Sequence, residues 1–146
     1  MPIYNLYLFD RNGQCVYYAE WLRLKNTPVN KDEEAKLLYG MVLSLKSFVS
    51  KLTPTADSRA NFKSFLTSTY KATLFETATG MRIIMTTDRT AAGIYELLRQ
   101  IYAEAVVPYV MKTGLLKDGV IRSKMFENHV HELVQKHSSY FQPNKP

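Results

Sequence analysis

The hydrophobic pattern opens with two β-prone runs, Ile3 to Phe9 and Cys15 to Trp21. Between them lies Asp10-Arg11-Asn12-Gly13, where Asn and Gly readily adopt the positive φ values that tight hairpin turns require. The first run is apolar on both faces apart from Asn5, which is typical of a central strand covered on both sides. We therefore expect a β-hairpin whose first strand lies inside a covered sheet.

A long helix is predicted to begin after Asn30 and to end before Pro54. Asn30 can cap its N-terminus, and Glu33 can reach back to complete the cap. The acidic run Asp32-Glu33-Glu34 is expected in the first turn and Lys51 in the last, which matches the helix dipole at both ends and favours capping over catalysis for the carboxylates. The expected core face consists of apolar residues at helical spacing: Leu38, Met41, Val42, Leu45, Phe48, Val49 and Leu52.

The opposite face of this helix is predicted to carry a small apolar patch. Tyr39 and Leu43 stand one turn apart, and Gly40 and Ser47 add small side chains where another backbone could approach closely. Two interpretations are open: the pair packs under a loop or a strand edge, or it forms a surface that binds a partner. We take Tyr39, Gly40, Leu43 and Ser47 as the candidate partner-binding residues.

Three further β-prone segments follow, Phe62 to Tyr70, Lys71 to Thr77 and Met81 to Thr87. The last two are joined by a turn that ends in Gly80. Phe65 lies three positions after Phe62 and breaks strict alternation, so the pattern does not fix the register of the first segment.

Two helices complete the pattern. Asp88 or Thr90 is expected to cap the first, which Pro108 kinks or ends, and the second runs over roughly Val120 to Lys136. Their apolar positions are Ile94, Leu97, Leu98, Ile101, Ala105 and Tyr109 in the first and Phe126, Val130, Leu133 and Val134 in the second.

The resulting order, β-β-α-β-β-β-α-α, predicts an α+β fold. We expect a five-stranded antiparallel sheet with the first helix on one face and the last two on the other. Residues 1–140 are predicted to form one domain and residues 141–146 a loose tail with nothing to bury. A chain of 146 residues can bury a full core without disulfides or a structural metal.

Composition and charge narrow the function classes. The lone Cys15 cannot form an internal disulfide, and the first residues lack the pattern of a signal peptide or a spanning helix, so we expect a cytoplasmic protein. The net charge is +6, but no cluster of four or more basic residues occurs. Because a binding stripe needs adjacent Lys and Arg to neutralise phosphates, we expect no nucleic-acid partner.

No motif of enzymatic strength is present. The six glycines offer neither a phosphate-binding loop nor a dinucleotide fingerprint. His129 and His131 are two residues apart on a helix and point in different directions, which favours surface histidines over a metal site. Cys15 fits a small buried strand residue better than a nucleophile. We expect no catalytic residue, no metal and no cofactor.

The chain resembles the sedlin-like longin family of subunits of the trafficking protein particle complex, TRAPP, in its subunit 1 branch. The resemblance spans nearly the whole chain and is carried by YNLYLFDRNG, by Tyr17-Tyr18-Ala19-Glu20-Trp21, by EEAKLLYGMVLSLKSFVSKL, by TLFETATGMRIIMTTD and by LLRQIYAEAVVPYV. It implies a longin fold, also called SNARE-like, with no catalytic residue of its own.

The resemblance also implies a function. Such a chain is a core subunit of a vesicle-tethering complex in ER-to-Golgi transport, and the assembled complex acts as a guanine nucleotide exchange factor for a Rab GTPase. The implied partners are the other TRAPP subunits and, through them, the Rab GTPase, with peripheral location at the endoplasmic reticulum and cis-Golgi. The alternative is another longin-domain trafficking adaptor, such as a small adaptor chain. A small enzyme or ligand carrier is a more distant alternative.

Overall fold

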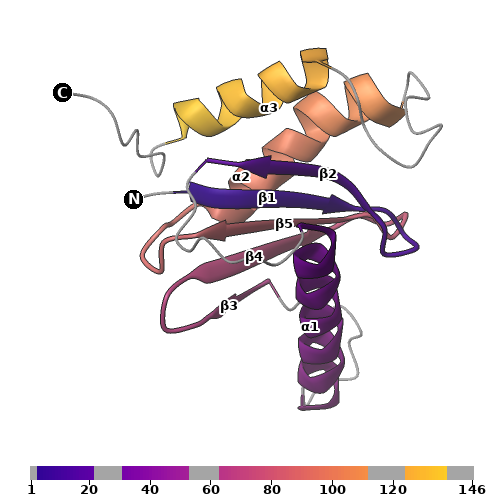
Figure 1. Ribbon diagram of the computed structural model, residues 1–146, viewed down its shortest axis with the longest axis vertical. Helices are drawn as coiled ribbons and strands as arrows, with labels where there is room; N and C mark the ends of the chain where they lie inside the picture. Colours follow the sequence, from indigo (N-terminus) through magenta and orange to yellow (C-terminus); the bar gives the residue numbers. More distant parts are fainter. Residues whose placement is uncertain (1–2, 22–30, 53–62, 112–123, 138–146) are drawn as a thin grey trace.

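The computed structural model describes residues 3–21, 31–52, 63–111 and 124–137 (Figure 1). Its centre is a five-stranded antiparallel sheet with the strand order β2-β1-β5-β4-β3. This confirms the predicted α+β architecture. The strands are β1 (Ile3–Phe9), β2 (Cys15–Glu20), β3 (Ser64–Leu66), β4 (Lys71–Glu76) and β5 (Arg82–Thr87).

The β1–β2 turn has the chemistry that its sequence predicts. Gly13 has a φ of 84°, and the Asp10 carboxylate accepts hydrogen bonds from the backbone N–H groups of Asn12 (2.9 Å) and Gln14 (3.0 Å). Strand β1 also pairs with β5 on its other edge, from Ile3 beside Thr87 to Phe9 beside Arg82. The first strand of the chain is therefore central in the sheet, as expected.

Strand β3 is shorter than the predicted segment from Phe62 to Tyr70. It ends at Leu66 because the Thr67 hydroxyl forms a turn, accepting from the backbone N–H of Tyr70 (3.0 Å) and donating to the Tyr70 carbonyl (3.1 Å). Side-chain to backbone hydrogen bonds of this kind compete with strand pairing.

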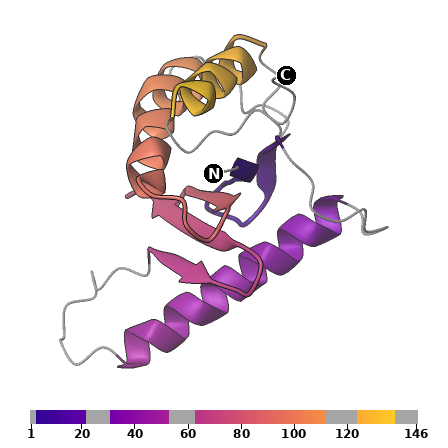
Figure 2. The same cartoon turned by 90° about the vertical axis from the view of Figure 1, so that its left-hand side faces the viewer.

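One helix covers one face of the sheet and the remaining helices cover the other, as predicted (Figures 1 and 2). The first is α1 (Lys31–Leu52). On the opposite face lie α2 (Ile94–Ile101), its continuation as a π-helix, η1 (Tyr102–Met111), and α3 (Lys124–Lys136). None of the helices in the described ranges combines the length and the apolar character that crossing a bilayer requires.

Two details of the second helix differ from expectation. The residue that caps α2 is Gly93, with a φ of 73°, and neither Asp88 nor Thr90 is in that position. Asp88 instead accepts the Thr90 backbone N–H (2.9 Å) in a local turn before the helix. Pro108 lies inside η1, so of the two predicted outcomes, a kink or an end, the structure excludes the end. The predicted cap at Asn30, residues 120–123 and the tail 141–146 lie outside the described residues.

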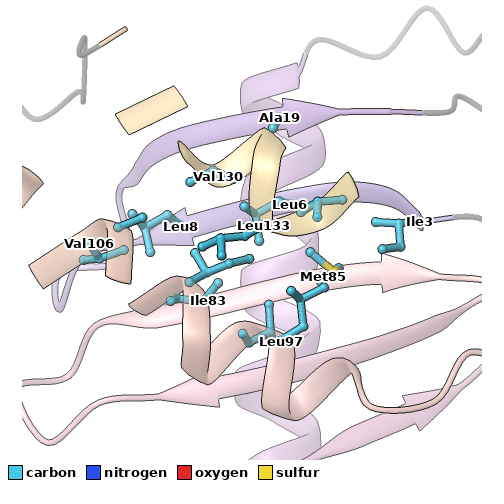
Figure 3. Packing of buried hydrophobic residues seen from close by; sticks show 14 of the residues in the cluster. Ile3, Leu6, Leu8, Ala19, Ile83, Met85, Leu97, Val106, Val130 and Leu133 are labelled. Carbon is cyan, nitrogen blue, oxygen red and sulfur yellow. The ribbon is translucent and has the colours of Figure 1, made fainter. Parts of the chain in front are cut away.

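Two apolar cores lie on the two faces of the sheet. On the α2 and α3 side, Leu6, Leu8 and Ile83 meet Leu97 and Leu133 (Figure 3). On the α1 side the core is smaller and consists of Tyr7, Phe9, Ala35, Leu38, Val42, Ala72, Leu74 and Ile84. Each large apolar side chain that folding buries contributes about 1.5–3 kcal/mol.

Candidate functional site

Helix α1 is longer than the sheet is wide. It runs across the strands, and its C-terminal half extends past β3 (Figure 1). A helix of 22 residues is about 33 Å long, whereas five strands at their usual spacing span about 19 Å between the outermost axes. Among the α1 side chains whose burial the structure describes, only Ala35, Leu38 and Val42 are buried, and none of the three lies beyond Val42, the twelfth of the 22 residues. Beyond Val42 the sheet therefore covers α1 only in part, through half-buried side chains such as Leu45 and Lys46.

Four large apolar side chains of α1 are exposed to solvent. The exposed fractions are 70% for Leu37, 38% for Met41, 60% for Phe48 and 67% for Leu52. Spacings of four, seven and four residues place them within about 60° of one another around the helix. We call these four residues the α1 apolar stripe. Exposed Gly40, Ser44 and Ser47 lie beside it, so the surface combines large apolar groups with positions of close approach.

A set of polar and aromatic contacts fixes the opposite side of α1 to the sheet. Arg82 Nη1 donates to the Tyr39 hydroxyl at 3.0 Å, and the Tyr39 ring packs against Phe9 with 5.1 Å between centroids. Arg82 also pairs with Glu76 (3.0 Å), whose carboxylate in turn contacts Lys46 Nζ (2.6 Å). Because these contacts set the rotation of α1, the apolar stripe faces away from the domain.

This arrangement corrects the predicted faces of the helix. Leu38 and Val42 are buried as expected, but Met41, Phe48 and Leu52 are exposed and do not belong to the core. For Tyr39 the structure matches the first of the two open interpretations, because its ring packs on the sheet side against Phe9 and the Gly13 turn.

The other three candidate partner-binding residues lie at different depths. Gly40 and Ser47 are exposed, and a Cβ built on Gly40 would meet nothing within 4 Å. Leu43 is half-buried. Their role in binding a partner stays a prediction. Leu37 was not among the predicted binding residues. The sequence nevertheless contains a signal for it, because the helical spacing of Leu37, Met41, Phe48 and Leu52 places them in a second apolar row.

The residues considered for chemistry are held in local contacts. Cys15 is half-buried, and its Sγ donates to the Tyr17 carbonyl at 3.4 Å. His131 Nε2 lies 3.9 Å from Glu127, and its ring packs against Trp21 with 5.1 Å between centroids. Within residues 3–21, 31–52, 63–111 and 124–137, no group of three or more His, Cys, Asp or Glu could hold a metal ion.

The shifted pKa values of Tyr17, Tyr7 and Asp88 belong to side chains in the core or in a local turn. Burial raises the pKa of Tyr17 to about 12, and the nearby Glu127 carboxylate adds to the shift. Burial likewise raises the pKa of Tyr7, mainly because its ring lies in the core beneath α1. Hydrogen bonds from Thr90 lower the pKa of Asp88. None of these groups lies on the α1 apolar stripe.

Comparison with known proteins identifies relatives along most of the chain. Residues 3–137 match the Sybindin-like family. Trafficking protein particle complex subunit 1 of Rattus norvegicus is 43% identical over 136 residues, which cover 92% of this chain and 93% of that protein. The subunit of the same name from Homo sapiens is 42% identical with the same coverage.

A solved structure described as MglB with tetrameric arrangement has a similar fold. Its TM-score is 0.51 at 20% identity, and the match covers 71% of this chain and 74% of that one. At this identity the likeness shows the fold alone.

Proposed function

Because this chain belongs to the Sybindin-like family, we propose that it works as a structural subunit of a trafficking protein particle complex. The support is the match to subunit 1 relatives over more than nine-tenths of both chains. Matches of that coverage leave little room for an additional domain with a separate activity in the relatives.

The observation that carries the proposal is the α1 apolar stripe. Leu37, Phe48 and Leu52 are each at least 60% exposed, and they share one face of a helix that extends beyond its own sheet. An exposed apolar row of this kind favours contact with a neighbouring subunit, since a large apolar side chain that becomes fully buried at an interface contributes about 1.5–3 kcal/mol to the binding free energy. The other subunits of the complex are the proposed occupants, with Gly40 and Ser47 at the flank of the contact.

The finer proposal concerns what the assembly does. We propose that the complex promotes guanine nucleotide exchange on a Rab GTPase in ER-to-Golgi transport, and that this chain supplies part of the shaped surface without a catalytic residue. Exchange requires that the surface bind the nucleotide-free GTPase more tightly than the loaded form, which needs no acid–base pair. The chain would then associate with endoplasmic reticulum and cis-Golgi membranes peripherally, through the complex.

The first test introduces negative charges into the α1 apolar stripe. In a Leu37→Asp, Phe48→Asp double variant, we expect co-purification with the other subunits to fall at least about tenfold while the chain alone unfolds near the wild-type temperature. The reason is that both side chains are already exposed in the free chain, so charge costs little until a partner must desolvate it. Co-purification and a thermal melt of the same preparations provide the readouts.

Two controls accompany this variant. Leu66→Asp, Met125→Asp places the same charges on equally exposed apolar residues outside α1 and should leave assembly unchanged. Val42→Ala truncates a fully buried residue and should lower the free energy of unfolding by about 2 kcal/mol. If the stripe variant melts normally and assembles at wild-type strength, α1 does not form the contact and the strand edges become the better candidate.

The second test separates the subunit from the assembly. We expect the isolated chain not to release labelled nucleotide from a Rab GTPase, whereas the reconstituted complex does, because one domain of this size offers only part of an exchange surface. A fluorescence assay of nucleotide release measures both. Full activity in the chain alone would contradict the proposed division of labour.

A further inference from the structure

A hollow of about 260 Å³ lies on the α2 side of the sheet, away from the α1 apolar stripe. One wall comes from the β3–β4 edge and the other from the start of α2. We propose that this hollow is an anion site that binds a single phosphate group. Its lining residues are Lys63, Ser64, Lys71 and Thr73 from the sheet edge and Gly93, Ile94, Tyr95 and Glu96 from the helix.

Thr73 is the buried donor of the site. Its neighbours Ala72 and Leu74 pack into the core beneath α1, so strand alternation directs Thr73 to the opposite face, toward α2. Only 3% of the residue is exposed, and within the described part of the chain its Oγ1 has no hydrogen-bond partner. Buried hydroxyls are almost always paired in folded proteins, and an oxygen of a bound anion would supply the missing acceptor.

The start of α2 supplies backbone donors. Gly93 is the N-cap residue, and because glycine has no side chain it cannot itself cap the helix. The first N–H groups of a helix have no partner within the helix and lie at the positive end of its dipole, which is why anions bind at this position. Ile94, Tyr95 and Glu96 of this first turn all line the hollow.

Two lysines lie at the rim of the hollow and have N–H donors available for an anion. Lys71 Nζ makes one long contact, 3.4 Å from the Ala91 carbonyl, and keeps two further N–H donors. Lys63 Nζ lies 4.8 Å from the centroid of the Tyr95 ring. Ser64 is paired in register with Thr73, which places a second hydroxyl beside the first. Glu96 is the one opposing charge among the lining residues.

The size and chemistry of the hollow select a small, strongly charged group. Pockets for drug-sized ligands measure about 300–1,000 Å³, so 260 Å³ suits one phosphate group better than a nucleotide. A phosphate offers three strong acceptor oxygens and close to two negative charges, which matches two lysines, two hydroxyls and a helix N-terminus better than a carboxylate does. The group could belong to a lipid headgroup or to free phosphate, and the experiment distinguishes these sources.

The test is a titration of the full chain with inorganic phosphate, followed by amide NMR, with sodium chloride of equal ionic strength as the reference. We expect saturable shifts of the Ile94, Tyr95 and Glu96 amides. Thr73→Val keeps the side-chain volume and Lys71→Met keeps the apolar stem, and each should weaken binding at least about fivefold. Glu96→Gln should tighten binding, because it removes the opposing charge.

Lys36→Met is the matched control, because it removes the same charge from α1, on the other face of the sheet. It should leave phosphate affinity unchanged. Equal weakening by Lys36→Met and Lys71→Met would mean that net charge alone attracts the ion, and it would overturn the proposal. The absence of saturable shifts in the first turn of α2 would overturn it as well.

A flotation assay identifies the source of the phosphate. Vesicles of phosphatidylcholine with phosphatidic acid should carry the wild-type chain, and inorganic phosphate should compete, if the hollow binds a lipid headgroup. Phosphate binding by NMR without flotation assigns the site to free phosphate. Flotation that Thr73→Val and Lys71→Met leave intact would exclude the hollow as the lipid site.

Discussion

At the scale of single residues, Gly13 is constrained by its backbone and by its neighbour. Its φ of 84° is unfavourable for other residues, and a Cβ would lie 2.6 Å from Cε1 of Tyr39. Tyr39 cannot easily move away, because its hydroxyl accepts a hydrogen bond from Arg82. We expect Gly13→Ala to lower the free energy of unfolding by about 2–4 kcal/mol, measured by denaturant titration.

Gly80→Ala is the control for this substitution. Gly80 has a φ of 90°, but the nearest side-chain atom to its Cβ position is Arg11 Cβ at 3.1 Å, on an exposed residue. Strain without a ring clash should cost about 1–2 kcal/mol. Equal losses for the two variants would show that the contact with Tyr39 adds nothing.

A second prediction at this scale concerns alkaline pH. Burial raises the pKa of Tyr17 from its ordinary value of 10.0 to about 12. The unfolded chain therefore loses this proton first, so the stability is fully present below pH 10 and is lost as pH rises from 10 toward 12. Tyr17→Phe should reduce the loss in the free energy of unfolding between pH 10 and pH 12, measured by denaturant titrations across that range. An unchanged slope in the variant would contradict the assignment to Tyr17.

At the scale of elements, a substitution on the exposed face of α1 should affect the stability of the chain and its assembly with other subunits differently. Gly40 lies in the interior of this helix, and a Cβ there would meet nothing within 4 Å. Gly40→Ala should raise the free energy of unfolding of the chain alone by about 0.5–1 kcal/mol, because alanine loses less backbone entropy in a helix. In the complex the same methyl group should weaken assembly if a partner backbone packs there.

The two effects thus have opposite signs, and a thermal melt with a co-purification measures both. A variant that melts higher and assembles as tightly as the wild type would place Gly40 outside the interface.

The elements that local chemistry specifies could be predicted from the sequence. The β1–β2 and β4–β5 hairpins follow from glycines that adopt positive φ at positions 13 and 80. The extent of β3 could not be predicted, because the turn depends on where the Thr67 hydroxyl finds its partners.

The faces of α1 could be predicted only in part. Periodicity reveals apolar rows, but it does not give the width of the sheet that decides which row is covered. The side chain of Tyr39 is oriented by its hydrogen bond with Arg82, which lies 43 positions further along the chain. A contact between residues so far apart in sequence produces no local sequence pattern. The exposure of the α1 apolar stripe follows from the rotation of the helix and, at Phe48 and Leu52, from the part of α1 that extends past β3.

At the scale of the whole molecule, the two faces of the sheet are covered unequally. The core beneath α2, η1 and α3 draws on most of the apolar side chains, whereas α1 covers its face with only a few buried residues. Contacts of Tyr39 with Arg82 and of Lys46 with Glu76 anchor α1, and past Lys46 the helix carries the exposed Phe48 and Leu52, so it is suited to join the domain to a neighbour. The proposed phosphate site lies on the other face of the sheet, so a phosphate group and a subunit on α1 could be bound at the same time.

The central position of β1 has a consequence for synthesis on the ribosome. Strand β1 is made first, yet one of its edges stays open until β5 is made, since Phe9 pairs with Arg82 and Ile3 with Thr87. At translation rates of about 5–20 residues per second, the open edge of an apolar strand waits on the order of 4–15 s for its neighbour. The nascent chain therefore presents an aggregation-prone strand until the second hairpin emerges, and a chaperone at the ribosome exit would find its binding site in Ile3–Phe9.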